Sequence, residues 1–354
     1  FDHQSVMSLL KDRRFGRECP KDLAQSTPKH LAPFYKLEAN SMLELEPPRH
    51  SRLRGLVLRA FTSRRIASLE PEIKQLCHIL IDDFKSSEID LLEAYAKPLP
   101  ATIIARLLGV PESMADDLLG WSNDMVMMYQ ARRSKTLEAR AVAASQAFSD
   151  FMRCFIEERR TRPADDLITH LIAAEEEGQR LTTDEMITTC ILLLNAGHEA
   201  TVHTLGNGVK TLLETAVPES CLAPKYIDGT VEEILRFDPP LHMFTRYANA
   251  DLTVQGHALK RGDQIALILG AAGRDPANWS DPDVFNPTRK VQTNAAFGAG
   301  IHFCLGAALA RLELRTALPI VFERCPQMQL ARPPCYADVY HFHGLQKLFV
   351  KTGL

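Results

Sequence analysis

The sequence lacks the features that mark membrane-spanning, exported and nucleic-acid-binding proteins. Its 354 residues carry a formal net charge of −3, which provides no basic field for nucleic acid or an anionic membrane. Apolar runs such as residues 191–194 fall far short of the ~20 residues of a membrane span. Residues 1–4 show no signal-peptide pattern. We therefore expect a cytoplasmic protein that binds neither nucleic acid nor a membrane.

Cysteine pairs are missing as well. The eight cysteines are scattered and form no C-x-x-C pair, so the sequence supports neither a disulfide framework nor a zinc knuckle. What is present is ordinary for a globular protein, with 45% hydrophobic and 24% charged residues. We expect one large hydrophobic core in a reducing compartment, with most thiols buried.

Helices dominate the expected secondary structure. Apolar periodicity predicts helices over residues 49–61, 66–85, 98–108, 112–129, 137–160, 182–214, 230–237 and 305–320, and strands over 243–248, 251–254 and 265–269. Residues 29–47 have few signals and are expected to form a loop. This order predicts a mainly α, α+β fold in a single domain over residues 1–354.

The helix over residues 182–214 is expected to be roughly 50 Å long at 1.5 Å per residue, enough to cross the whole domain. Thr182 and Glu185 form a capping box at its start. Gly197 lies in its middle, where a glycine costs ~1 kcal/mol relative to alanine. That glycine therefore needs a packing or functional reason.

A glycine-rich loop around Cys304 carries the strongest chemical signal. Gly298 and Gly300 allow unusual backbone angles and a close approach to a flat ligand. Cys304 comes where the loop meets a helix N-terminus, whose free N–H groups and dipole lower a thiol pKa and favour the thiolate. A lone cysteine is more often a buried structural thiol, so the surrounding pattern decides.

That pattern resembles the haem-binding loop of the cytochromes P450, in which Phe, two Gly, a basic residue and Cys-x-Gly recur at this spacing. The matching residues are Phe297, Gly298, Gly300, His302, Cys304 and Gly306. The resemblance implies the helical prism of that family, with a long central helix and a small β-rich subdomain. It implies haem b (iron protoporphyrin IX) with Cys304 as the axial metal ligand, whose thiolate favours O–O cleavage.

Further residues acquire haem-binding roles through the resemblance. His50 and Arg54 share a helix face and would otherwise be read as a solvated basic surface. The family implies that they bind the haem propionates, anions that suit the planar Arg fork, together with Arg246 and His302. It also implies that Ala196 contacts the haem.

Glu233 and Arg236 form an E-x-x-R pair on one helix face. Alone, such a pair is read as a surface ion pair worth a few tenths of a kcal/mol. The resemblance implies instead a structural pair, closed by Arg289, that fixes the fold around the haem.

Residues 196–201 resemble the family's oxygen-activation motif, A-G-x-[DE]-T-[TS], in which a locally disrupted helix, an acid and an alcohol relay protons. Glu199 fits the acid, but Ala200 stands where the first alcohol is expected. Thr201, an ordered water or a substrate hydroxyl can take that role. The resemblance thus implies Glu199 and Thr201 as catalytic residues, while His198 is read as a helix-face residue and not as a metal ligand.

His341 and His343 lie on one face of an expected strand and could be read as a metal pair. No third ligand is apparent in the sequence, so a structural role or a place in the pocket wall is favoured.

The implied activity is that of a monomeric, soluble, bacterial-type monooxygenase. It would insert one oxygen atom of O2 into an apolar or amphipathic small-molecule substrate, with electrons from ferredoxin or flavodoxin and its reductase. Pocket walls are expected at residues 31–43, 125–135, 193–200 and 241–244. Cations expected at the partner-docking face are Arg49, Arg52, Arg59, Arg311 and Arg315.

Two other functions stay open at this point. One is a peroxide-driven haem-thiolate enzyme, against which Glu199 argues. The other is a non-catalytic haem sensor or binding module, to which Ala200 gives some weight. The family also begins several dozen residues earlier, and residues 12–15 resemble the segment that follows its first sheet. We therefore expect that the family's N-terminal part is missing, which would leave a sheet edge open.

Overall fold

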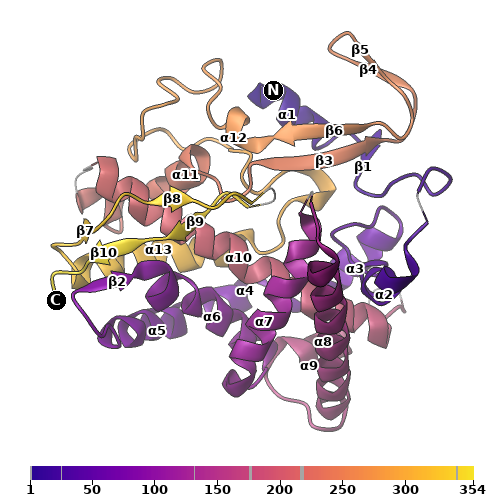
Figure 1. The fold of residues 1–354 in the computed structure, drawn as a ribbon, viewed down its shortest axis with the longest axis horizontal. Coiled ribbons are helices and arrows are strands. Elements are labelled where there is room, and N and C mark those ends of the chain that lie inside the picture. Colours follow the sequence, from indigo (N-terminus) through magenta and orange to yellow (C-terminus); the bar gives the residue numbers. More distant parts are fainter. Residues whose placement is uncertain (1, 25, 131, 175–177, 216–218, 340–341) are drawn as a thin grey trace.

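A long helix, α10 (Thr183–Thr215), runs through the middle of the fold and contacts helices on several sides. The computed structural model describes all residues except 1, 25, 131, 175–177, 216–218 and 340–341. Around α10 pack α6 (Pro98–Leu108), α7 (Ala115–Val126), α8 (Lys135–Thr161), α9 (Leu167–Ala173), α11 (Ile227–Phe237) and α13 (Ala307–Arg324) (Figure 1). The predicted mainly α architecture is confirmed.

The other helices of the described chain have between 4 and 13 residues. They are α1 (His3–Leu9), α2 (Ala32–Glu38), α3 (Arg49–Ala60), α4 (Ser63–Ala67), α5 (Glu70–Asp82) and α12 (Leu269–Ala272), with 3₁₀ or π turns at Lys29–Leu31, Leu92–Ala96, Glu112–Met114, Met127–Tyr129, Glu219–Leu222 and Gly300–His302. Helix α2 lies where the sequence predicted a loop. In place of the single helix expected over 66–85, the structure has two helices. Helix α4 ends at Ala67, and α5 begins at Glu70 with a proline in its first turn.

The described residues also form four small antiparallel sheets. One has the order β1 (Phe15–Gly16), β3 (Met243–Ala248), β6 (Gln264–Ile268), and another β2 (Glu88–Asp90), β10 (Phe349–Lys351), β7 (Gln329–Leu330). Two hairpin-like pairs join β4 (Leu252–Val254) to β5 (His257–Leu259) and β8 (Cys335–Tyr336) to β9 (Leu345–Lys347). Phe15 pairs with Ala248, so residues 15–16 form an edge strand of the first of these sheets.

The predicted capping box at the start of α10 is present. The Thr182 N–H donates to the Glu185 carboxylate at 3.0 Å, and the Glu185 N–H donates to the Thr182 hydroxyl at 3.2 Å. Most of the helix beyond it is buried, which explains its apolar run. Within the described residues, no helix is both long enough and apolar enough to span a membrane.

Candidate functional site

A cavity of about 240 Å³ opens between α10 and the loop that carries Cys304. By a comparable measure, roughly 10–15 Å³ is enough for one water, so this space suits a much larger group. Its lining is mostly apolar, with α10 contributing Ile191–Leu193, Ala196, Gly197, Ala200 and Thr201, and other segments Ile104, Val126, Leu241, Phe244, Phe297 and Phe342. The Cys304 side chain reaches the same cavity.

The Cys304 loop requires its two glycines. Gly298 and Gly300 have φ angles of +67° and +73°, in the region that L side chains rarely adopt. A Cβ at Gly298 would lie 3.0 Å from the Phe244 ring, and one at Gly300 would lie 2.6 Å from a backbone oxygen of Leu10. The Cys304 N–H donates to the Phe297 carbonyl at 3.0 Å, which closes the loop.

The electrostatics at the Cys304 sulfur differ from the sequence-based expectation. Burial raises the pKa of the thiol, while the Gly306 N–H and the Arg54 guanidinium act in the opposite direction. Helix α13 begins only at Ala307, so the helix end does not outweigh the burial. The predicted lowering of the pKa by the protein alone is therefore wrong. Coordination by a metal cation deprotonates such a thiol outright.

Basic side chains gather at one end of the cavity. Its lining includes Arg17, His50, Arg54 and His302, and Arg246 is buried near Arg17. Within the described part of the chain, buried Arg17 Nε and His50 Nδ1 have no hydrogen-bond partner. Burial and the charge of His302 lower the pKa of His50 to about 4. An anionic ligand would supply the missing partners, so this end fits acidic groups.

Two carboxylates hold this cationic cluster in place. Arg17 lies 2.7 Å from Glu44, and the His302 ring nitrogen Nε2 lies 3.1 Å from Glu46. The cluster contains the guanidinium groups of Arg17, Arg54 and Arg246 but only these two carboxylates, so it keeps an excess of positive charge. Arg17 was not predicted, because it is distant in sequence from every motif and carries no local signal.

Helix α10 is unbroken through residues 196–201, so the locally disrupted helix implied by the motif is not seen. Thr201 and Ala200 line the cavity, whereas Glu199 is not part of its lining. Ring nitrogens of His198 and His203 each lie 3.5 Å from the Glu199 carboxylate. Although burial raises it, these two histidines hold the pKa of Glu199 well below its usual range. The catalytic role of Glu199 stays a prediction.

A second acid, Glu313 on α13, lies beside the cavity and was missed by the sequence analysis. Its side chain is 1% exposed, and its Oε2 has no partner within the described chain. Burial raises the pKa of Glu313 to about 8, while the nearby Thr201 hydroxyl acts against this shift. The sequence did carry a signal for Glu313. This charged residue lies four residues after Leu309 and four before Ala317, on the otherwise apolar face that α13 buries.

Replacing Glu313 with Gln is expected to flatten the pH dependence of stability. The carboxyl has a pKa near 4.5 when unfolded and about 8 when folded, so folding takes up a proton between these values. Stability should therefore fall by a few kcal/mol as the pH rises through this window, and the Gln variant should not show that fall. Denaturant unfolding at a series of pH values would measure it. Glu323→Gln, exposed on the same helix, should retain the slope of the unmodified protein.

The E-x-x-R pair is buried and has the predicted third member. Arg236 Nε and Nη2 each donate to Glu233 at 2.7 Å, and Arg289 Nε lies 3.3 Å from Glu233. Glu233 also accepts from the Asn286 N–H at 2.8 Å. The alternative of a surface ion pair is wrong, since Glu233 is 4% and Arg236 2% exposed.

The expected pocket walls are partly present. Glu38, from the end of α2, and Tyr129 line the cavity, and the Tyr129 hydroxyl donates to Glu38 at 3.0 Å. Burial and the charge of Glu44 raise the pKa of Glu38 to about 7. Met125 and Met128 lie instead in the hydrophobic core.

His341, which was expected on the same strand face as His343, lies outside the described residues.

Comparisons with known proteins agree with this geometry. The sequence profile of the family described as "Cytochrome P450" matches residues 21–215 and 224–330. Cytochrome P450 107B1 of Saccharopolyspora erythraea is 40% identical, over 88% of this chain and 77% of that protein. The crystal structure of P450BioI in complex with acyl carrier protein ligated to hexadec-9Z-enoic acid matches with a TM-score of 0.93, at 32% identity over 99% of this chain and 91% of that one. CYP109E1 of Bacillus megaterium in complex with testosterone matches with a TM-score of 0.87, at 31% identity over 100% of this chain and 92% of that one.

Proposed function

The chain belongs to the cytochrome P450 family and is therefore a haem-dependent monooxygenase, and we propose that its substrate is an apolar or amphipathic small molecule oxidised with electrons from ferredoxin or flavodoxin and its reductase. The observation that carries this proposal is the apolar cavity that holds the Cys304 side chain. We also propose that the protein works as a cytoplasmic monomer, which light scattering on the purified haem protein would check.

The side chains around the cavity fit both the iron and the propionates of a haem. Cys304 would hold the iron, and Arg17, His50 and Arg54 would bind the propionates, with Arg246 near Arg17. The chemistry that haem supplies when bound is activation of O2 and transfer of one oxygen atom to an organic substrate. The protein positions that substrate, keeps bulk water away with apolar walls, and supplies protons.

The Thr201 hydroxyl and the Glu313 carboxyl are the groups we propose to hold a proton at the cavity. Thr201 lines the cavity, and burial raises the pKa of Glu313 to about 8, which favours its protonated form at neutral pH. The unpartnered Glu313 Oε2 leaves an oxygen free for a water. Ala200, where the motif has its first alcohol, contributes no such group.

Replacing Thr201 with Val is expected to lower product formation by about 10²-fold, the lower end of what a positioned proton donor contributes. Reducing equivalents should then be consumed without product, so the ratio of product to NAD(P)H oxidised reports the defect. Thr201→Ser keeps the hydroxyl and should restore that ratio. An equal ratio of product to NAD(P)H oxidised in the Val and Ser variants would mean that the Thr201 hydroxyl does not supply the proton.

An amphipathic substrate is supported by the uneven polarity of the cavity. Its walls are mostly apolar, while Glu38 and Tyr129 form a polar corner. The similar structures named above hold a fatty acyl carrier protein or a steroid, both with large apolar parts. Apolar groups can therefore fill the cavity while one polar group meets Glu38.

The function is tested by comparing two ways of driving turnover. Haem-loaded protein is supplied with a panel of fatty acids and steroids, and with either NAD(P)H, reductase and ferredoxin or flavodoxin, or hydrogen peroxide. Oxygenated product with the redox partner, at a higher rate than with peroxide, is the expected result. Turnover with peroxide alone would identify the peroxide-driven class, and no turnover with either would favour a non-catalytic haem protein.

Arg315 is expected to contribute to docking of the electron donor. It is exposed on α13, one turn after Arg311, whose guanidinium lies 4.5 Å from the Phe297 ring of the Cys304 loop. Arg315→Glu should slow reduction by an acidic ferredoxin about tenfold at low salt, with a smaller effect at high salt. Lys135→Glu at the start of α8 makes the same change in net charge and should leave the rate unaltered. Stopped-flow reduction at several salt concentrations would measure both.

A further inference from the structure

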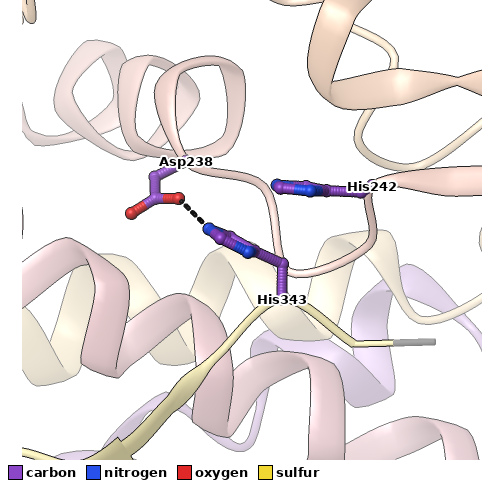
Figure 2. Close-up of side chains that lie close together, drawn as sticks. All are labelled: Asp238, His242 and His343. Atoms are coloured by element: carbon purple, nitrogen blue, oxygen red, sulfur yellow. Dashed lines mark ion pairs between the residues drawn. The ribbon is translucent and has the colours of Figure 1, made fainter. Parts of the chain in front are cut away.

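Three potential metal ligands from two segments that are distant in sequence lie close together (Figure 2). Asp238 and His242 flank the turn between α11 and β3, and His343 precedes β9. Their ligand atoms all lie within 4.8 Å of one another. His343 Nε2 lies 3.0 Å from Asp238 Oδ1, and Figure 2 shows both imidazoles extending toward that carboxylate.

We propose that Asp238, His242 and His343 form a second metal site, separate from the haem, for a divalent transition-metal ion such as Zn²⁺. Two imidazoles and a carboxylate are a ligand set that zinc uses in proteins, with a water in the fourth position. His242 is exposed and His343 partly exposed, so an ion can enter from solvent.

The backbone on which these ligands sit is fixed by Asn207 of α10. The side-chain amide of this fully buried residue donates to the Asp238 carbonyl at 3.2 Å and to the His343 carbonyl at 3.0 Å. The His343 N–H donates to the Pro240 carbonyl at 2.7 Å. Two segments about a hundred residues apart in sequence are thus fixed relative to each other, which is the preorganisation that a metal site needs.

Tyr336 supports the ligands from behind. Its hydroxyl donates to Asp238 Oδ2, which leaves Oδ1 directed at His343. Its ring stacks on the His343 imidazole with a centroid distance of 4.0 Å and an interplanar angle of 18°. Such outer partners orient metal ligands and strengthen binding.

The local charge favours a cation. Lys210 Nζ lies 3.7 Å from Asp238 and 3.1 Å from Glu214, so one ammonium group faces two carboxylates. These three side chains together therefore carry a net negative charge next to the two histidines. A divalent ion would be attracted to this setting.

Binding requires a rearrangement of His242. The rings of His242 and His343 stack with their centroids 3.8 Å apart at an interplanar angle of 22°, so an ion in the plane of one ring lies outside the plane of the other. The exposed His242 must tilt for both nitrogens to meet one ion. His343 Nε2 faces Asp238 Oδ1, so the neutral imidazole must carry its N–H on Nδ1 for Nε2 to bind the ion.

An ion at this site would join two parts of the cavity wall. Leu241 precedes His242 and Phe342 precedes His343 in the chain, and both line the cavity. The bound ion would therefore tie together the two wall segments. From the sequence, a structural role or a place in the pocket wall was favoured for His343, because no third ligand was apparent. The structure brings Asp238 and His242 to it from about a hundred residues earlier in the chain.

Zinc titration of the haem-loaded protein, in competition with a chromophoric chelator, tests the site. We expect one equivalent to bind, and His242→Gln and Asp238→Asn each to weaken that equivalent at least about tenfold. His170→Gln is the matched control, because His170 forms an exposed pair with Asp165 at 3.3 Å and belongs to no three-ligand group of the described residues. It should bind zinc like the unmodified protein.

Two results would overturn the proposal. One is the absence of a saturable equivalent in the unmodified protein, and the other is equal zinc affinity in His242→Gln and His170→Gln. Because His242 is exposed, its replacement should leave the circular dichroism and the haem spectrum unchanged. Weak zinc binding to exposed thiols is shared by all variants and cancels in the comparison.

Discussion

Replacing Cys304 with Ser should abolish the strongly red-shifted Soret band of the reduced carbon monoxide complex and lower substrate oxidation at least about a hundredfold. Loss of an outer partner of a metal ligand already costs about 10–100-fold, and here the ligand itself is removed. The hydroxyl lacks the electron donation by which a thiolate favours O–O cleavage. Absorption spectroscopy and turnover with the redox partner measure the two effects.

Two companion variants separate loss of the ligand from loss of the haem. Cys304→His supplies a different axial ligand and should retain haem with an imidazole-type carbon monoxide band. Cys154→Ser removes an exposed thiol on α8 and should change neither spectrum nor turnover. A red-shifted band that persists in Cys304→Ser would mean that another residue holds the iron.

Features determined by neighbouring residues could be predicted from the sequence. The capping box of α10 depends on Thr182 and Glu185 alone, and both hydrogen bonds are present. The backbone of the Cys304 loop likewise depends on Gly298 and Gly300, whose positive φ angles follow from their missing side chains. Helix ends were less predictable, because packing against other elements decides where a helix stops.

Features that depend on distant segments could not be predicted. Arg17 reaches the cationic end of the cavity from the strand β1 region, and Glu313 meets Thr201 only because α13 packs on α10. Burial is also a tertiary property. It reversed the expected direction of the Cys304 pKa, because a helix N-terminus stabilises the thiolate less than burial destabilises it.

Replacing Glu233 with Gln should destabilise the folded protein by about 3–5 kcal/mol and lower its retention of haem. The substitution leaves the buried guanidinium of Arg236 and its neighbour Arg289 without their carboxylate, and breaking one side of a buried ion pair carries a cost of this size. Guanidinium unfolding followed by circular dichroism, with the haem spectrum recorded in parallel, would measure both effects.

The exposed pair of Lys97 and Glu93 gives the matched control. Its members lie four residues apart on the surface, and their side chains are 46% and 59% exposed. Glu93→Gln should therefore cost about 0.5 kcal/mol or less, because solvent screens such pairs. Similar costs for Glu93→Gln and Glu233→Gln would contradict a structural role for the buried pair.

Arg236→Lys tests why the pair is built from arginine. Arg236 donates to both Glu233 oxygens and, through Nη1, to the carbonyls of Gly273 at 2.7 Å and Pro282 at 2.8 Å. A lysine keeps the charge but cannot make these planar contacts together, so the Lys variant should be destabilised nearly as much as Glu233→Gln. Full stability in the Lys variant would mean that charge alone is required. The expected loss of stability would mean instead that Arg236 holds α11 against the segment before the Cys304 loop. In this way it helps to fix the position of Cys304.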